Sequence, residues 1–171
     1  MAEAGDRSEA LIALRHWLKG RRYYNHMPAR MIWALCPSRI WESYLKFTTD
    51  RDPFEKVMSQ YSRRRKDNGS EYNLDTYFAE TRMPLNLPLY TDCDGDLMVD
   101  RILRYEGLDA ELGRLSGELG VPWAGTLDVR AKSGFRAAEG RPAREALPEP
   151  HKDRIRQVFA EEFRLNGYPT R

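Results

Sequence analysis

The sequence is poor in the residues that build disulfide frameworks and metal centres. It has two cysteines, Cys36 and Cys93, and three histidines, His16, His26 and His151, among 171 residues. The cysteines are too few and too far apart for a disulfide framework or a zinc site, and the histidines show no metal-ligand spacing. We therefore expect a reducing, metal-free setting.

Long hydrophobic runs and strong net charge are lacking as well. Residues 1–20 carry charges through their first ten positions and contain no apolar run of the ~20 residues that span a membrane. Basic residues outnumber acidic ones by only 28 to 26, so the whole-protein field does not favour a nucleic-acid or membrane partner. We expect a cytoplasmic protein in which any anion site is local.

What the sequence does contain is an alternation of extended and helical patterns within one domain, residues 1–171. Residues 44–49, "YLKFTT", predict a strand that is followed by a helix. Residues 86–105 predict two extended runs around an Asp-Gly turn, and residues 106–120 then predict a second helix. Because the order strand-then-helix occurs twice, we expect an α/β fold with a parallel sheet.

The bounds of the other segments are predicted mainly from proline, glycine and serine residues that begin or end helices. They read as a helix from Ser8 to Gly20, a short helix after Pro28, a mobile loop over residues 131–148, and one last helix from about Pro150 to Asn166.

An Asp-Pro step marks the start of the helix after the first predicted strand. Asp52 is a good N-cap, Pro53 suits the first helical position, and Glu55 completes a capping box. Ser59 lies seven residues after Asp52, almost two turns, and therefore returns to the face of the cap. Arg51 and Ser59 are then ~10 Å apart along the axis, a gap that an extended arginine and a phosphate-sized anion fill.

Spacing alone leaves a second interpretation open for these residues. Arg51 can instead form an ion pair with Asp50 or Glu55 while Ser59 faces solvent.

Four segments, in order, resemble the sulfotransferases, and most closely their carbohydrate branch with its bacterial relatives. "YLKFTTDRDPFEKVMSQY" resembles the 3′-phosphate-binding segment of that family, and "NHMPARMIWAL" its histidine-containing segment. "DGDLMVDRILRYEGLDAELGRLSGELGVP" is similar to a strand-to-helix segment, and "FAEEFRLNGY" to the closing helix. The resemblance covers roughly residues 26–168.

The resemblance implies a P-loop-like fold, with a central parallel sheet flanked by helices, that uses 3′-phosphoadenosine 5′-phosphosulfate and no metal. A sulfuryl group would pass to an acceptor hydroxyl, and the expected acceptor is a carbohydrate. Arg51 and Ser59 match the family's 3′-phosphate ligands, and Lys132 falls in a loop that supplies a further phosphate contact. His26 follows an expected strand end, "RRYYN", and matches the catalytic base, a role that suits histidine because the side chain in a model peptide has a pKa of ~6.5.

One part of the family pattern is missing. A Gly-rich 5′-phosphosulfate loop with a lysine and a hydroxyl residue should precede the histidine segment, and residues 1–20 offer no such loop. We therefore expect an N-terminally shortened sulfotransferase domain, with an uncovered sheet edge and possible self-association. The alternative is a catalytically silent module that binds adenosine 3′,5′-bisphosphate or a partner. A third interpretation, nucleic-acid binding by the basic run at residues 62–66, is disfavoured by the near-neutral charge.

Overall fold

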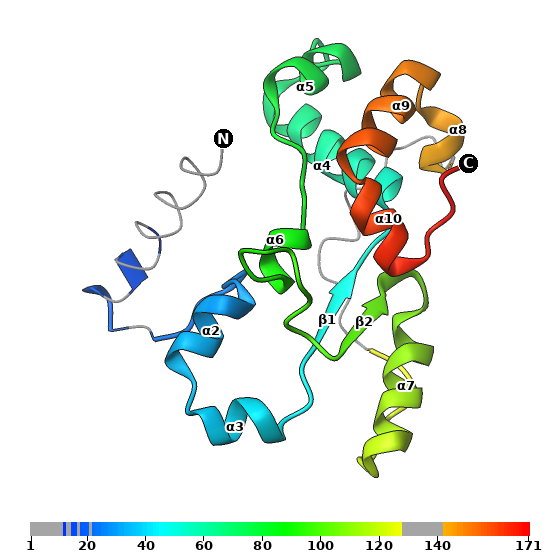
Figure 1. The fold of residues 1–171 in the computed structure, drawn as a ribbon. Coiled ribbons are helices and arrows are strands. Elements are labelled where there is room, and N and C mark those ends of the chain that lie inside the picture. The colour runs from blue at the N-terminus through cyan, green and yellow to red at the C-terminus, as the bar shows by residue number, and fades with distance from the viewer. Residues whose placement is uncertain (1–11, 13–14, 17, 21, 128–141) are drawn as a thin grey trace. The chain divides into compact units, whose positions relative to one another are not determined.

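A computed structural model describes residues 12, 15, 16, 18–20, 22–127 and 142–171 of the chain (Figure 1). The chain divides into two compact units. The first unit consists of Met1–Lys46 with Pro88–Asp100, and the second of Phe47–Leu87 with Arg101–Arg171. The expectation of one domain stays a prediction, because two compact units can belong to a single folding domain.

The first unit contains two short helices that each follow a proline. Helix α2 (Ala29–Leu35) begins directly after Pro28, as the sequence predicted. Helix α3 (Ser38–Ser43) follows Pro37 in the same way. Residues 22–25 form turn and coil, so the strand end expected in "RRYYN" is wrong for the part that is described.

The Asp-Gly turn of the first unit is a small hairpin. Asp92 accepts hydrogen bonds from the backbone N–H groups of Asp94 and Asp96, both at 2.9 Å. Thr91 and Leu97 face each other across an antiparallel bridge. The carboxylate of Asp92 therefore organises the turn internally, as expected for aspartate in a tight turn.

The second unit is built on a pair of parallel strands. Strand β1 (Phe47–Asp50) pairs with β2 (Arg101–Arg104), residue for residue from Phe47 opposite Arg101. Helix α4 (Pro53–Asn68) follows β1, and helix α7 (Leu108–Leu119) follows β2 after one 3₁₀ turn. The predicted mixed α/β class with a parallel sheet is confirmed, and the sheet of the described residues has two strands.

Helices make up most of the rest of the chain. They are α5 (Leu74–Glu80), α6 (Leu87–Tyr90), α8 (Ala143–Ala146), α9 (Glu149–Val158) and α10 (Ala160–Asn166). Helix α4 contacts α5, α8 and α9, as Figure 1 shows for the second unit. Their apolar faces share one core, formed by Phe54, Val57, Tyr61, Tyr77, Ala143, Leu147, Ile155, Phe159, Phe163 and Tyr168. Helix α4 contributes Phe54, Val57 and Tyr61 to this core.

Four of the predicted segments differ in the structure. The first strand begins at residue 47 and not at 44, and residues 87–90 are helical where an extended run was expected. Residues 143–146 form a helix inside the predicted loop 131–148, of which residues 131–141 lie outside the described part. The last helix is two helices, because Phe159 leaves helical geometry at φ −102° and ψ 17°.

Candidate functional site

The connection between β1 and α4, residues 50–56, is the candidate site, and we call it the β1–α4 corner. The side chain of Asp52 accepts hydrogen bonds from the N–H groups of Phe54, at 2.9 Å, and Glu55, at 3.4 Å. Pro53 occupies the first helical position, where no N–H is needed. The predicted N-cap is confirmed, so local sequence alone specifies where α4 begins.

The second half of the predicted capping box is wrong. The N–H of Asp52 donates to Oε1 of Glu106 at 2.9 Å, and not to Glu55. Glu55 instead accepts from Nη2 of Arg51 at 2.9 Å and from the N–H of Ala143 at 3.0 Å. Parallel pairing of the strands brings Glu106, just after β2, to the start of α4, where it takes the place of the local glutamate.

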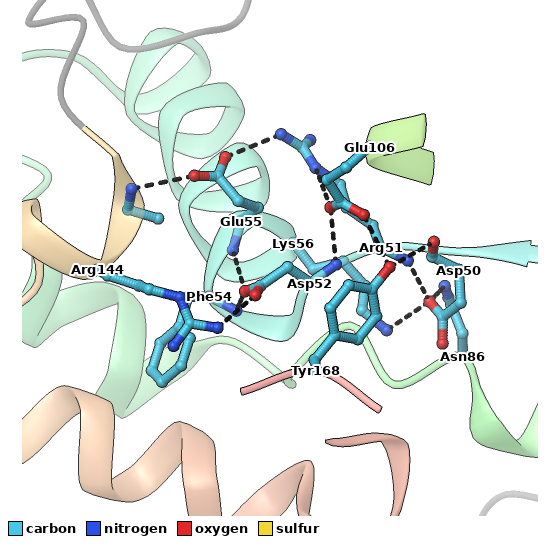
Figure 2. Close-up of polar contacts among 11 residues, drawn as sticks. Asp50, Arg51, Asp52, Phe54, Glu55, Lys56, Asn86, Glu106, Arg144 and Tyr168 are labelled. Carbon is cyan, nitrogen blue, oxygen red and sulfur yellow. Dashed lines mark hydrogen bonds and ion pairs between the residues drawn. The ribbon is translucent and has the colours of Figure 1, made fainter. Parts of the chain in front are cut away.

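Arg51 faces two carboxylates at this corner (Figure 2). Its side chain, 22% exposed, pairs with Glu55 at 2.9 Å and lies 4.0 Å from Glu106. Its guanidinium carbon lies 5.4 Å from the centre of the Tyr105 ring. Nε is buried without a hydrogen-bond partner among the described residues. The ion pair that the second interpretation expected for Arg51 is therefore present.

A buried lysine lies on the inner side of the corner. Nζ of Lys56 donates to Oδ1 of Asp50 at 2.8 Å and to Oε2 of Glu162. Neither carboxylate has exposed side-chain surface, and the lysine side chain is 8% exposed. Nζ also lies 5.3 Å from the centre of the Phe159 ring. Burying three charges is costly in water-excluded surroundings unless every one is paired, as these are.

Neutral donors complete the coordination of both buried carboxylates. Asp50 accepts from the side-chain amides of Asn86, at 2.8 Å, and Asn166, at 2.9 Å. Glu162 accepts from the N–H groups of Asn86, at 2.6 Å, and Leu87, at 2.8 Å. These last two bonds cap the start of α6, which explains why residues 87–90 are helical despite their extended pattern.

Tyr168 connects the chain's closing segment to the same corner. Its hydroxyl lies 2.7 Å from Oε2 of Glu106 and 3.1 Å from the carbonyl oxygen of Asp50. Burial, with the neighbouring carboxylate of Glu106 as a second cause, raises the pKa of this hydroxyl well above its usual value. Tyr168 therefore remains a hydrogen-bond donor at all moderate pH values and holds Glu106 in place.

Arg144 attaches α8 to the start of α4. Its Nη2 lies 2.5 Å from Oδ2 of Asp52 and 2.7 Å from the carbonyl oxygen of Pro169. The guanidinium carbon lies 4.5 Å from the centre of the Phe54 ring. Asp52 thus acts both as the N-cap of α4 and as the partner of a cation.

The corner and the charged residues that contact it carry a net negative charge when all groups are ionised. The cations are Arg51, Lys56 and Arg144, and the carboxylates are Asp50, Asp52, Glu55, Glu106 and Glu162. Each cation has a carboxylate partner within 3 Å. An incoming anion at this corner must therefore replace a carboxylate.

The four residues predicted to form the site have different locations. Arg51 and Ser59 both belong to the second unit, with Ser59 half-buried within α4. His26 belongs to the first unit, where it is exposed in a turn before Pro28, at φ 61°. Lys132 lies outside the described residues. The roles proposed for these residues stay predictions.

The other two histidines contact aromatic rings. His16 stacks on Tyr24, with ring centres 4.4 Å apart. His151 stacks on Phe78 at 4.2 Å, and its Nε2 lies 3.1 Å from Oδ1 of Asp75. The side chain of His151 is only 16% exposed.

Lys56 in the corner, and several residues that contact the corner, were not predicted from the sequence. Glu106, Glu162, Asn166 and Tyr168 all fall within segments that carry the family resemblance, yet nothing in their local spacing assigns them a role. Lys56 was missed because one lysine on a helix ordinarily faces solvent. A charged residue between Phe54 and Val57 on the buried face was the available signal.

Two classes of site find no support in the described part of the chain. The residues that the structure describes contain no cluster of three or more histidine, cysteine, aspartate or glutamate side chains arranged to hold a metal ion. None of their helices combines the length and the hydrophobicity that a membrane crossing requires.

The described fold and corner define a mixed α/β protein in which a charged network closes the end of a parallel strand pair. No family model matches the chain, and no solved structure matches it significantly. It is 31% identical over 109 residues to an uncharacterized protein of Archaeoglobus fulgidus, a match that spans 61% of this chain and 89% of the archaeal one. The chain belongs to the same family as that archaeal protein.

Proposed function

We propose that the chain is a sulfotransferase-type domain that binds 3′-phosphoadenosine 5′-phosphosulfate through Arg51 and transfers its sulfuryl group to an acceptor hydroxyl. A carbohydrate is the acceptor class that the sequence resemblance suggests. The proposal also takes the fold to be a P-loop-like sulfotransferase fold, of which β1, β2, α4 and α7 would be part.

The observation that carries the proposal is the position of Arg51. It lies at the carboxyl end of β1 and at the start of a 16-residue helix, with Tyr105 following the parallel strand β2 beside it. Ligands of open parallel sheets bind at this end of the strands, and helix N-termini favour anions. The side chain remains 22% exposed, and its guanidinium carries several N–H donors that a phosphate oxygen could engage in place of a carboxylate.

The chemistry assigns a separate role to His26. Sulfuryl transfer forms a bond from the acceptor oxygen to sulfur and breaks the bond from sulfur to the 5′-phosphate oxygen, releasing adenosine 3′,5′-bisphosphate. The acceptor hydroxyl loses its proton in this step, and His26 would accept it as general base. Arg51 and Ser59 would hold the 3′-phosphate and not take part in proton transfer.

A second candidate function is binding of adenosine 3′,5′-bisphosphate without turnover. Arg51 pairs with Glu55 and lies near Glu106. This arrangement favours the second candidate, because an arginine whose charge is already balanced by carboxylates binds an added anion weakly.

Isothermal titration calorimetry on the full chain tests nucleotide binding. We expect adenosine 3′,5′-bisphosphate to bind more tightly than 5′-AMP, and Arg51→Ala to remove most of that preference, since an ion-paired phosphate contact contributes about 1.5–3 kcal/mol. Arg63→Ala, an exposed arginine on the same helix, is the matched control and should leave the preference intact. Equal affinity for the two nucleotides would contradict the proposal.

Transfer of radiolabelled sulfate to a panel of sugar acceptors separates the two candidates. Turnover that falls ~10²–10⁴-fold in His26→Ala, with nucleotide affinity unchanged, would establish the transferase. Nucleotide binding without any transfer would establish the silent module.

A further inference from the structure

We infer that Glu55 is an internal competitor for Arg51, so that the anion affinity of the corner is set by the exchange of one carboxylate for one phosphate. This inference rests on the proposed function and assigns a regulator to its site. Oε2 of Glu55 is 2.9 Å from Nη2 of Arg51; Arg51 precedes α4, and Glu55 lies in its first turn, four positions later. A phosphate that binds Arg51 through the same edge of the guanidinium must displace this oxygen.

Glu106, the other carboxylate near Arg51, is fixed by different partners. Its Oε1 accepts from the N–H of Asp52 at 2.9 Å, and its Oε2 lies 2.7 Å from the hydroxyl of Tyr168. Its approach to Nε of Arg51 is longer, at 4.0 Å. Glu106 therefore keeps its place whether or not Arg51 is bound to a ligand, and Glu55 is the carboxylate that exchanges.

The second oxygen of Glu55 makes the competition effective. Oε1 accepts from the N–H of Ala143, the first residue of α8, at 3.0 Å. Ala143 is 3% exposed and belongs to the core, so this donor is held firmly. Glu55 is thereby oriented toward Arg51 in advance and loses little side-chain entropy when the ion pair forms.

Glu55→Gln is the variant that isolates the charge. Glutamine retains a carbonyl oxygen for the N–H of Ala143 but no longer forms an ion pair with Arg51. We expect adenosine 3′,5′-bisphosphate to bind Glu55→Gln about tenfold more tightly than the unmodified protein, the effect of one charge-assisted hydrogen bond, with a much smaller gain for 5′-AMP. Glu118→Gln removes the same charge from an exposed position near Arg101 and should leave affinity unchanged.

Each outcome of this titration has a defined meaning. Unchanged affinity in Glu55→Gln, together with weaker binding in Arg51→Ala, would overturn the competition and leave the proposed function standing. Equal gains for both nucleotides would also overturn it, since a general charge effect would then suffice. No binding to either protein would overturn the proposed function and the competition together, because releasing Arg51 should have created a site.

A measurement on the unmodified protein guards against a variant that fails to fold. In a protein labelled with ¹³C at glutamate side chains and ¹⁵N at arginine, added nucleotide should shift the Glu55 carboxyl signal and the Arg51 Nε signal with one common midpoint. A shift of the Arg51 signal while the Glu55 signal stays constant would show that phosphate binds without displacing the carboxylate, and would refute the inference.

Discussion

The backbone N–H of Asp52 donates to Oε1 of Glu106 at 2.9 Å across a sequence separation of 54 residues. One free N–H group at the start of α4 is therefore satisfied by a residue that follows the neighbouring strand. The same carboxylate holds Tyr168, so the corner joins both parallel strands to the closing segment of the chain. The stability of the corner should consequently depend on long-range contacts as much as on the local cap.

Asp52 has two roles that substitutions can separate. Asp52→Asn should retain the N-cap, because an amide oxygen also accepts hydrogen bonds, but weaken the contact with Arg144. Asp52→Ala removes both and should cost a further ~0.5–2 kcal/mol of unfolding free energy. Urea denaturation of the two variants measures the difference, and equal stability of asparagine and alanine would contradict the capping role.

Lys56 should be among the most sensitive positions in the second unit. Lys56→Met leaves the carboxylates of Asp50 and Glu162 buried without their cation, and we expect a loss of about 3–5 kcal/mol in unfolding free energy. Lys66→Met, at the exposed end of the same helix, should cost less than about 1 kcal/mol. Similar losses in chemical denaturation at the two positions would show that the buried pairing contributes little.

Alkaline pH should destabilise the protein through Tyr168. Its pKa is higher in the folded state than the value of about 10 in the unfolded chain, so its contribution is complete below pH ~10 and is lost as pH rises toward the folded-state value. Tyr168→Phe should be less stable at neutral pH but lose less stability between about pH 9 and about pH 11. Tyr44→Phe, which alters an exposed tyrosine, should behave as the unmodified protein in the same urea titrations.

Two glycines should respond in opposite directions to alanine. Gly167 has φ +60°, and a Cβ there would meet Nη2 of Arg104 at 2.8 Å, so Gly167→Ala should destabilise by about 1–2 kcal/mol or more. Gly117 lies within α7 with open space around it, so Gly117→Ala should stabilise by roughly 0.5–1 kcal/mol. Thermal melting measures the stability of both variants. A higher melting temperature for Gly167→Ala would contradict the expected backbone strain at residue 167.

The elements that the sequence predicted well are those with local causes. The start of α4 follows from Asp52 and Pro53, and the start of α2 from Pro28, because each contact lies within a few residues. The parallel pairing of β1 with β2 followed from the order of strands and helices. Ser59 and Arg51 were placed correctly on α4 and before it, although spacing could not decide what Arg51 binds.

The parts that could not be predicted depend on contacts between distant residues. Glu55 does not cap α4 because Glu106, Arg51 and Ala143 offer other partners. Residues 87–90 are helical because Glu162 accepts from the N–H groups of Asn86 and Leu87 at the start of α6. Such contacts leave no periodic pattern in the sequence, since each involves one polar residue per segment.

The most direct measurement of the central claim is an NMR titration of the ¹⁵N-labelled full chain with adenosine 3′,5′-bisphosphate and, separately, with 5′-AMP. We predict saturable shifts of the Arg51 Nε–H signal and of the amide of Ser59 with the first nucleotide, and much smaller shifts of these signals with the second. Unperturbed Arg51 and Ser59 signals at saturating adenosine 3′,5′-bisphosphate would contradict the assignment of the β1–α4 corner as a 3′-phosphate site.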